Sequence, residues 1–427
     1  MRIVHLATGA AGMYCGSCMH DNRLAATLRA HGHDVILIPL YTPLRTDEQD
    51  VSRQRIFFGG INVYLQQVSA FFRHTPRLLD RLFDARWLLN LVARRAAGTD
   101  PRQLGAMTVS VLRGQDGPQR KELDKLIDAL RRLRPALVYL PNLLFIGFAG
   151  PLKTALGVPV LCGLSGEDIF IDRLPAPHLD ETLRLIRAGA ANVEAFVALT
   201  DYSADHAAEH FGLPRERIHR IPMGIRAGDF PAPPDRPPGT PVTLGYLGRI
   251  CPDKGLHVLA EAFIQLRQTR RHCRLCAAGY LGPAERPYLD RIRTRLHHAD
   301  AADAFEYAGV IDRAGKLAFL RSIDMLAMPT TYPEAKGFSV LESLAAGVPV
   351  VLPRRGSFPE LIDATGGGLL YDPDDPDALA HTLTRLADDA DLRRELGTRG
   401  RDRVHAEFSA DRMADQAWQL FRRFARP

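Results

Sequence analysis

Two glutamates separated by seven residues are the strongest indication of a ligand site in this sequence. Glu334 and Glu342 occur in the run PEAKGFSVLE, and Gly337 lies at the predicted start of a helix. A glycine there lets the backbone approach a ligand closely, and the free amides of the first helical turn attract an anion such as phosphate. Glu342 follows down the same helix, within reach of the ligand's hydroxyl groups. The alternative is an amphipathic helix with one exposed acid.

Two cations lie in the run GRICPDKG, between a predicted strand at 243–247 and a helix predicted from Gly255. Arg249 and Lys254 would both lie at the carboxyl end of that strand and before the amino end of the helix. All three features favour negative charge, so the run predicts a diphosphate site. On its own the run is equally typical of a solvated loop.

The elements that position these residues follow a βα rhythm. Short apolar runs alternate with segments of helical period, which is typical of parallel sheets and predicts an α/β fold. The first unit is a strand at 3–7, a glycine loop through Gly9, Gly12 and Gly16, and a helix that ends near Gly32. We predict further strands at 35–39, 137–140, 158–162, 195–199, 243–247, 274–278, 305–308, 325–328, 348–352 and 368–371.

A proline-rich run divides the chain. Residues 226–241 carry six prolines and no periodicity, which is typical of an extended linker. We therefore predict two Rossmann-like, doubly wound domains facing across a cleft. The predicted parts are an amino-terminal domain at 1–225, a linker at 226–240, a second Rossmann-like domain at 241–409, and a helical tail at 410–427 that returns to the first domain. Open α/β sheets bind ligands at the carboxyl ends of their strands, which places the site in the cleft.

Composition excludes several protein classes. The chain has 427 residues, 46% apolar and 24% charged, with a net charge of +6. These values are typical of a globular protein, and the mild basic excess suits anionic ligands without requiring nucleic acid. The longest nearly apolar stretch, 136–150, is too short to cross a bilayer. No signal peptide pattern begins the chain, so we expect a cytoplasmic protein with its six cysteines reduced.

Together these segments resemble the retaining nucleotide-sugar glycosyltransferases of family 4, which have the GT-B fold. The resemblance covers most of the chain and is strongest across GRICPDKG, PEAKGFSVLE and GSFPELIDATGGGLLYDPDDPDALA. It implies that Arg249 and Lys254 bind the donor diphosphate, that Glu334 lies at the sugar ring and that Glu342 bonds the ribose. It also implies donor contacts from the backbone of Gly337, Phe338 and Ser339 and from the glycine loop at Gly16.

The first domain departs from that family in one place. Many members carry a histidine after the strand represented here by VPVLCGL, whereas this chain continues with Ser165, Gly166, Glu167 and Asp168. Ser165 could donate a hydrogen bond to the sugar or acceptor. Glu167 and Asp168 could do the same, or could instead cap the following turn.

The resemblance implies an enzyme that moves a sugar, with retention, from a nucleoside diphosphate to an unidentified small-molecule, glycan or lipid acceptor. One alternative is a pseudo-enzyme or atypical transferase that binds the nucleotide sugar but lacks the usual histidine. A nicotinamide-dependent oxidoreductase is disfavoured, because GAAGMYCG lacks the GxGxxG spacing and no acidic ribose ligand follows the second strand.

Neither an obligatory metal nor another cofactor is expected. Asp372 and Asp374 resemble a DxD metal motif, but the intervening proline favours a turn and helix start. Cys15 and Cys18 have the CxxC spacing of zinc and redox sites, yet small loop residues are the favoured interpretation.

A basic segment at 71–95 carries six arginines against two aspartates, with leucines at near-helical spacing. Such a helix could lie on an anionic membrane and present a lipid acceptor. Docking on its own domain is the more common explanation of this pattern.

Overall fold

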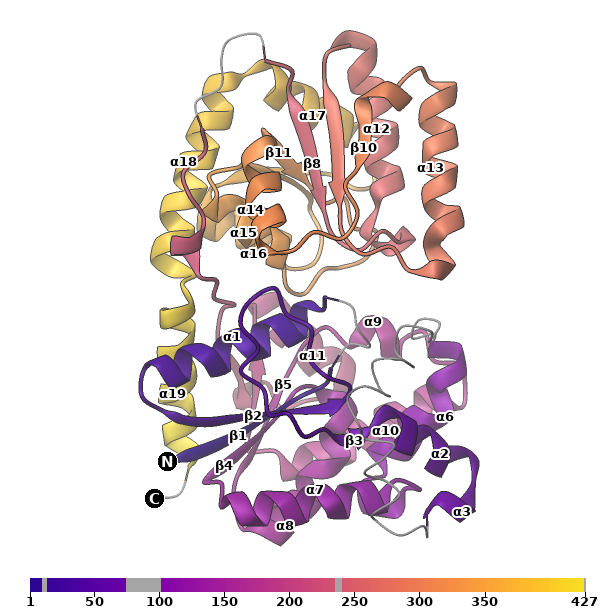
Figure 1. Ribbon diagram of the computed structural model, residues 1–427, viewed down its shortest axis with the longest axis vertical. Helices are drawn as coiled ribbons and strands as arrows, with labels where there is room; N and C mark the ends of the chain where they lie inside the picture. The colour runs from indigo at the N-terminus through magenta and orange to yellow at the C-terminus, as the bar shows by residue number, and fades with distance from the viewer. Residues whose placement is uncertain (10–13, 74–100, 235–239, 426–427) are drawn as a thin grey trace. The chain divides into compact units, whose positions relative to one another are not determined.

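The chain folds into two compact units, each a parallel sheet covered by helices (Figure 1). The computed structural model describes residues 1–9, 14–73, 101–234 and 240–425. The first unit comprises Met1–Gly224 together with Ala410–Pro427, and the second comprises Ile225–Ser409. Both units are α/β, which confirms the predicted fold class.

The sheet of the first unit has seven strands, all paired in parallel, in the order β3-β2-β1-β4-β5-β6-β7. The strand order reverses direction between β1 and β4, which is the position where doubly wound sheets open a crevice for ligands. The strands are β1 Arg2–Ala7, β2 Asp34–Tyr41, β3 Phe57–Gly59, β4 Leu137–Leu140, β5 Val160–Gly163, β6 Ala195–Ala198 and β7 Ile218–Arg220.

Side chains along β1 alternate between two apolar cores because successive strand residues point to opposite faces. Val4 and Leu6 belong to the core on one face, whereas Ile3 and Ala7 belong to the core on the other. Helices cover both faces, namely α1 Gly16–Ala30, α2 Gly60–Val68, α3 Ala70–Arg73, α6 Pro101–Leu112, α7 Arg120–Leu133, α8 Ala149–Leu156, α9 Asp168–Ile171, α10 His178–Gly189, α11 Asp201–Phe211 and α19 Ala410–Phe424.

The carboxyl-terminal helix α19 packs against α1 within the first unit. Its buried face contributes Met413, Ala417 and Phe421 to the same core as Ile3. Arg29, at the end of α1, donates to the carbonyl of Val35 at 2.7 Å and so ties the helix to β2.

The second unit has a six-stranded parallel sheet in the order β10-β9-β8-β11-β12-β13, whose direction reverses between β8 and β11. Its elements are β8 Thr243–Leu247, α12 Leu256–Thr269, β9 Arg274–Ala278, α13 Arg286–His298, β10 Phe305–Tyr307, α14 Arg313–Ser322, β11 Met325–Ala327, α15 Phe338–Ala345, β12 Val350–Pro353, α16 Phe358–Thr365, β13 Gly368–Tyr371, α17 Ala378–Asp388 and α18 Ala390–Glu407. This is the order of a dinucleotide-binding Rossmann sheet.

The boundary between the units lies at Gly224, and part of the segment predicted as a linker at 226–240 is built into the second unit. Ile225 forms a parallel bridge with Ser409, and its amide donates to the carbonyl of Phe408 at 2.8 Å. Asp229 pairs with Arg313 at 2.6 Å. These contacts depend on residues far along the chain, which the local proline content does not reveal.

Most of the basic segment predicted at 71–95 lies outside the described residues. Phe71 to Arg73 form the end of α3, and Phe71 is exposed. Within the described part of the chain, no helix combines the length and the apolar character that a bilayer span requires.

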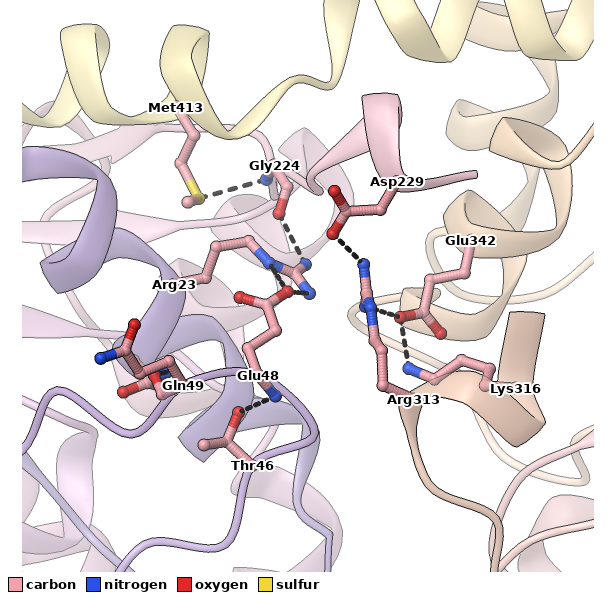
Figure 2. Close-up of polar contacts among 11 residues, drawn as sticks. Arg23, Thr46, Glu48, Gln49, Gly224, Asp229, Arg313, Lys316, Glu342 and Met413 are labelled. Carbon is pink, nitrogen blue, oxygen red and sulfur yellow. Dashed lines mark hydrogen bonds and ion pairs between the residues drawn. The ribbon is translucent and has the colours of Figure 1, made fainter. Parts of the chain in front are cut away.

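A fully buried arginine, Arg23, holds Gly224, the last residue of the first unit before the chain enters the second unit (Figure 2). Arg23 on α1 is 0% exposed and pairs with the buried carboxylate of Glu48, to which its Nε donates at 2.8 Å. Its Nη1 donates to the carbonyl of Gly224 at 3.1 Å, while the amide of Gly224 donates to the sulfur of Met413. Arg23 thus joins α1, the segment after β2 and the last residue before the second unit.

Replacing this arginine should be strongly destabilising. Arg23→Met leaves the buried Glu48 carboxylate without its guanidinium, and breaking a buried pair from one side typically costs about 3–5 kcal/mol. Urea unfolding should show this loss, and adding Glu48→Gln should recover part of it.

The matched control is Arg120→Met, because Arg120 is 68% exposed and lies 3.8 Å from Asp124. Exposed pairs contribute about 1 kcal/mol or less. An equally small loss for Arg23→Met would show that the buried pair does not hold this unit together.

Candidate functional site

The loop after β8 carries both of the predicted phosphate-binding cations. Arg249 is exposed, and its carbonyl accepts a hydrogen bond from the Tyr246 hydroxyl at 2.7 Å. Gly255 precedes α12 with a φ of 75°, and a Cβ there would lie 1.8 Å from the carbonyl oxygen of Pro329. Only glycine permits this approach, which holds the loop after β8 against the segment after β11.

That approach brings Lys254 and Glu334 together, although 80 residues separate them in the chain. The Lys254 ammonium contacts both Glu334 Oε2 and the Tyr332 hydroxyl. Tyr332 in turn donates to Glu334 Oε2 at 2.7 Å. The Lys254 and Glu334 side chains are only 17% and 12% exposed. The three residues therefore form a nearly buried polar network between β8 and β11, where the strand order reverses.

The network determines the ionisation of Glu334. Burial by itself would raise the pKa of Glu334, but the charge and hydrogen bond of Lys254, the Tyr332 hydroxyl and the charge of Lys336 together lower it to about 2. Burial and the Glu334 carboxylate raise the pKa of Tyr332, whereas the charge of Arg249 lowers it. At neutral pH the network therefore holds a carboxylate, an ammonium and a neutral phenol.

The backbone of Glu334 is fixed from a third side. Gly356, after β12, has a φ of 61°, and a Cβ there would lie 2.5 Å from the amide nitrogen of Glu334. The amide of Ser357 donates to the carbonyl of Glu334 at 2.8 Å. Three loops that follow β8, β11 and β12 thus position one carboxylate.

Helix α15 begins directly after Gly337, which has a φ of 69°. Phe338 is buried and Ser339 is half-buried in its first turn. The first amides of a helix have no acceptor within the helix and are suited to binding an anion. The predicted helix start at Gly337 is confirmed, whereas the donor contacts expected of Gly337, Phe338 and Ser339 remain predictions.

Glu342 lies in an ionic cluster of its own (Figure 2). It is 2% exposed, and its Oε1 accepts from the Lys316 ammonium at 2.6 Å and lies 4.0 Å from Arg313. Arg313 also pairs with Asp229 at 2.6 Å. Two cations on α14 therefore hold the carboxylate that the sequence assigned to the ribose, and the interpretation as an exposed acid does not hold.

Of the first-unit candidates after β5, Glu167 has a structural role. Glu167 is buried and accepts from the amides of Ser165 at 2.7 Å and Leu143 at 2.8 Å. Burial raises the pKa of Glu167 despite these bonds. Glu167 thus joins the turn after β5 to the segment after β4, as a structural bridge.

Asp168 and Gly16 lie at helix starts in the same unit. Asp168 opens α9 and lies 3.4 Å from His206 on α11, and its hydrogen bond and charge raise the pKa of that histidine. Gly16 is the first residue of α1, and a Cβ there would meet no atom within 4 Å. Among the described residues, packing therefore does not require a glycine at this position, and the donor contact expected of Gly16 remains a prediction.

Asp372 and Asp374 form a turn. Asp372 Oδ1 accepts from the amide of Asp374 at 3.0 Å, and Asp374 is 88% exposed and lies 3.5 Å from Arg355. Across the described residues, no group of three histidine, cysteine, aspartate or glutamate side chains is arranged to hold a metal ion.

Three residues of the site were not predicted from the sequence, namely Tyr332, Arg313 and Lys316. Tyr332 lies two positions before Glu334, and this spacing in an extended segment could have drawn attention to it. No sequence pattern indicated that Lys316 belongs to the site, because its partner Glu342 lies 26 residues away on another helix.

Two family models match this chain. Residues 20–224 match the model described as a glycosyl transferase 4-like domain, and residues 233–403 match glycosyl transferases group 1. WcaL of Escherichia coli strain K12, assigned to colanic acid biosynthesis as a glycosyltransferase, is 30% identical over 57% of this chain and 59% of its own length. A GDP-mannose-dependent phosphatidylinositol monomannoside mannosyltransferase of Mycobacterium tuberculosis is 28% identical over 60% of this chain and 67% of its own. The chain thus spans less than two thirds of WcaL.

Solved structures share the whole fold at low identity. The sucrose-phosphate synthase of Thermosynechococcus elongatus superposes with a TM-score of 0.72 at 19% identity, covering 99% of both chains. HepE of Anabaena, solved with UDP, gives 0.69 at 16% identity over 99% of this chain and 100% of its own. These structures share the GT-B fold of this chain, and the two family models, which together match most of its length, identify it as a glycosyltransferase with a glycosyl transferase 4-like domain in its first unit and a group 1 domain in its second.

Proposed function

We propose that this protein transfers a sugar, with retention of anomeric configuration, from a nucleoside diphosphate donor to a hydroxyl acceptor. The observation that carries the proposal is the contact of Lys254 with Glu334 at the point where the second sheet reverses its strand order. Such points bind nucleotides in open α/β sheets. The relatives support the donor class, because HepE was solved with UDP and the mycobacterial enzyme is named for GDP-mannose.

The reaction breaks the bond between the sugar and the diphosphate, and the site has charged groups to act on both of these parts. The acceptor oxygen forms its bond to the anomeric carbon on the face from which the diphosphate departs, and the departing phosphate oxygen takes the acceptor's proton. Arg249, Lys254 and the amides at the start of α15 stabilise the leaving charge. The ionised Glu334 would accept hydrogen bonds from the sugar, and Glu342 would contact the ribose.

A nucleotide-sugar-binding protein without transfer activity is the second candidate. Ser165 occupies the position where the resembled family carries a histidine, and Glu167 beside it is engaged with backbone amides. Incubation with an acceptor panel separates the two functions, since only a transferase yields a glycosylated product.

The test of the proposed function begins with a thermal-shift screen of nucleoside diphosphates and their sugars, because a ligand of the folded state raises its apparent stability. With the donor identified, Arg249→Ala and Lys254→Met should each lower turnover by about 10²–10³, typical of losing one preorganised charge-stabilising group. Donor affinity should fall less than turnover.

Arg271→Ala is the control, because Arg271 is an exposed cation of the same unit, in the turn before β9. Its turnover should stay near that of the unmodified protein. Unchanged turnover in Arg249→Ala and Lys254→Met, with circular dichroism intact, would place the diphosphate elsewhere.

We also propose that transfer needs no metal ion, since Arg249, Lys254 and helix amides supply positive charge where the diphosphate would bind. Activity should therefore persist in excess EDTA. Complete loss that magnesium restores would contradict this and direct attention to Asp372 and Asp374.

Stability should depend on pH through Glu334. Its folded pKa of about 2 lies below the ordinary 4.5, so its ionisation stabilises the fold above pH 4.5 and this contribution disappears as pH falls towards 2. In Lys254→Met, burial should dominate and raise the pKa of Glu334. The stability deficit of the variant should therefore be larger at pH 6.5 than at pH 3.5, by about 1–4 kcal/mol depending on how far the pKa rises.

Urea unfolding at both pH values measures this difference. The matched control is Lys153→Met, which removes a lysine that is 43% exposed and paired with Glu194. The control should cost about 1 kcal/mol or less. A deficit of equal size at both pH values for Lys254→Met would mean that Lys254 does not set the ionisation of Glu334.

A further inference from the structure

Two cysteines at the start of α1 form a contact that the transfer reaction does not use. Cys15 is the residue immediately before the helix, and Cys18 lies in its first turn. Cys15 is half-buried, whereas Cys18 is 0% exposed. Both are free thiols, and the Cys18 thiol is hydrogen-bonded to the Cys15 side chain.

The helix start accounts for this contact. The carbonyl of Cys15 accepts from the amide of Met19 at 2.9 Å, so Cys15 is the N-cap residue and Cys18 is the third residue of the helix. The Cys15 side chain makes no capping hydrogen bond to the backbone of the first turn and contacts the Cys18 thiol instead. A disulfide needs Cβ atoms about 3.5–4.5 Å apart, closer than the about 5–6 Å of neighbours three apart within a helix, so the bond closes when the N-cap residue, which lies outside the regular helix, shifts towards Cys18.

The surroundings of the two thiols give them different chemistry. The hydrogen bond with Cys15, burial and the charges of Cys15 and Asp21 all raise the pKa of Cys18, outweighing a backbone hydrogen bond from Gly9. Cys15 lies at the positive end of the helix dipole, which favours a thiolate. The half-buried sulfur is thus suited to attack, and the buried sulfur is suited to resolve the product.

The second CxxC run of the chain lacks these features. Cys276 lies in β9 and Cys273 precedes its first residue. Three residues of extended chain span about 10 Å, which is beyond the reach of a disulfide. The side chains of Cys273 and Cys276 also point to opposite faces of the strand. Burial is the main cause that raises the pKa of both thiols. Identical spacing therefore gives one pair in contact and one pair apart.

We propose that Cys15 and Cys18 form a reversible dithiol–disulfide site that reacts with low-molecular-weight disulfides of the glutathione type. The Cys15 thiolate attacks one sulfur of the disulfide, forms a mixed disulfide and releases one thiol. The Cys18 sulfur then attacks Cys15 Sγ, loses its proton and releases the second thiol. Two protein thiols are oxidised by two electrons, and one external disulfide is reduced to two thiols. The site adjoins Gly9 and Gly16, the described glycines of the loop after β1.

The test uses the full chain, reduced with dithiothreitol, freed of reductant and incubated with oxidised glutathione. Free thiols are then blocked with N-ethylmaleimide in denaturant, and the peptides are measured by mass spectrometry. The peptide with Cys15 and Cys18 should carry no maleimide and be two hydrogens lighter, and dithiothreitol should reverse this. Cys273 and Cys276 should keep their maleimide labels.

Two variants assign the roles. In Cys18→Ala, Cys15 should accumulate as a stable mixed disulfide with one glutathione, at least about tenfold faster than Cys276, which is also half-buried. In Cys15→Ala, the buried Cys18 should stay unmodified until the protein is unfolded. Circular dichroism checks that each variant is folded.

The proposal is overturned if both thiols remain free in the unmodified protein. It is also overturned if Cys273 and Cys276 oxidise equally fast, because spacing alone would then be responsible. A glutathione adduct on Cys15 that never converts to the internal disulfide would show that Cys18 cannot resolve it.

Discussion

The structure of the second unit depends on neutralising a carboxylate that lies almost entirely out of solvent. An isolated buried charge is costly, and Glu334 remains ionised chiefly because Lys254 and Tyr332 supply a cation and a hydroxyl on one oxygen. These partners come from the loop after β8 and from the segment after β11. The close approaches at Gly255 and Gly356 hold these segments and the loop after β12 together, and so make the pairing possible.

The first unit meets a similar requirement with different residues. Arg23 and Glu48 form a buried pair beside α1, and Glu167 joins the turns after β4 and β5 through backbone amides. In both units these buried carboxylates and their partners lie in connections and helices rather than in the strands. The parallel sheets provide a rigid frame, and a few ionic contacts determine the shape of the surface built on it.

Apolar runs alternating with helical periods were sufficient to predict the fold class and most strands, including β8, β9 and β13. The strands β3 and β7 were not predicted, because β3 (FFG) ends in a glycine and β7 (IHR) carries two polar residues, so neither forms an apolar run in the sequence. Glu334 and Lys254 were identified through a resemblance, and their mutual contact could not be predicted because it spans 80 residues. Likewise, spacing within α15 placed Glu342 correctly on a helix but did not reveal Lys316, since a contact between helices depends on packing.

The pairing of Ile225 with Ser409 means that the second unit begins and ends at one place. The second unit is therefore an insertion within the first, whose last helix, α19, follows it in the chain. Since α19 supplies Met413, Ala417 and Phe421 to the core beneath α1, that core is incomplete until the ribosome has passed the entire insertion. Synthesis thus delivers every residue of the second unit before α19 can complete this core, and until then the part of it that α19 covers stays exposed.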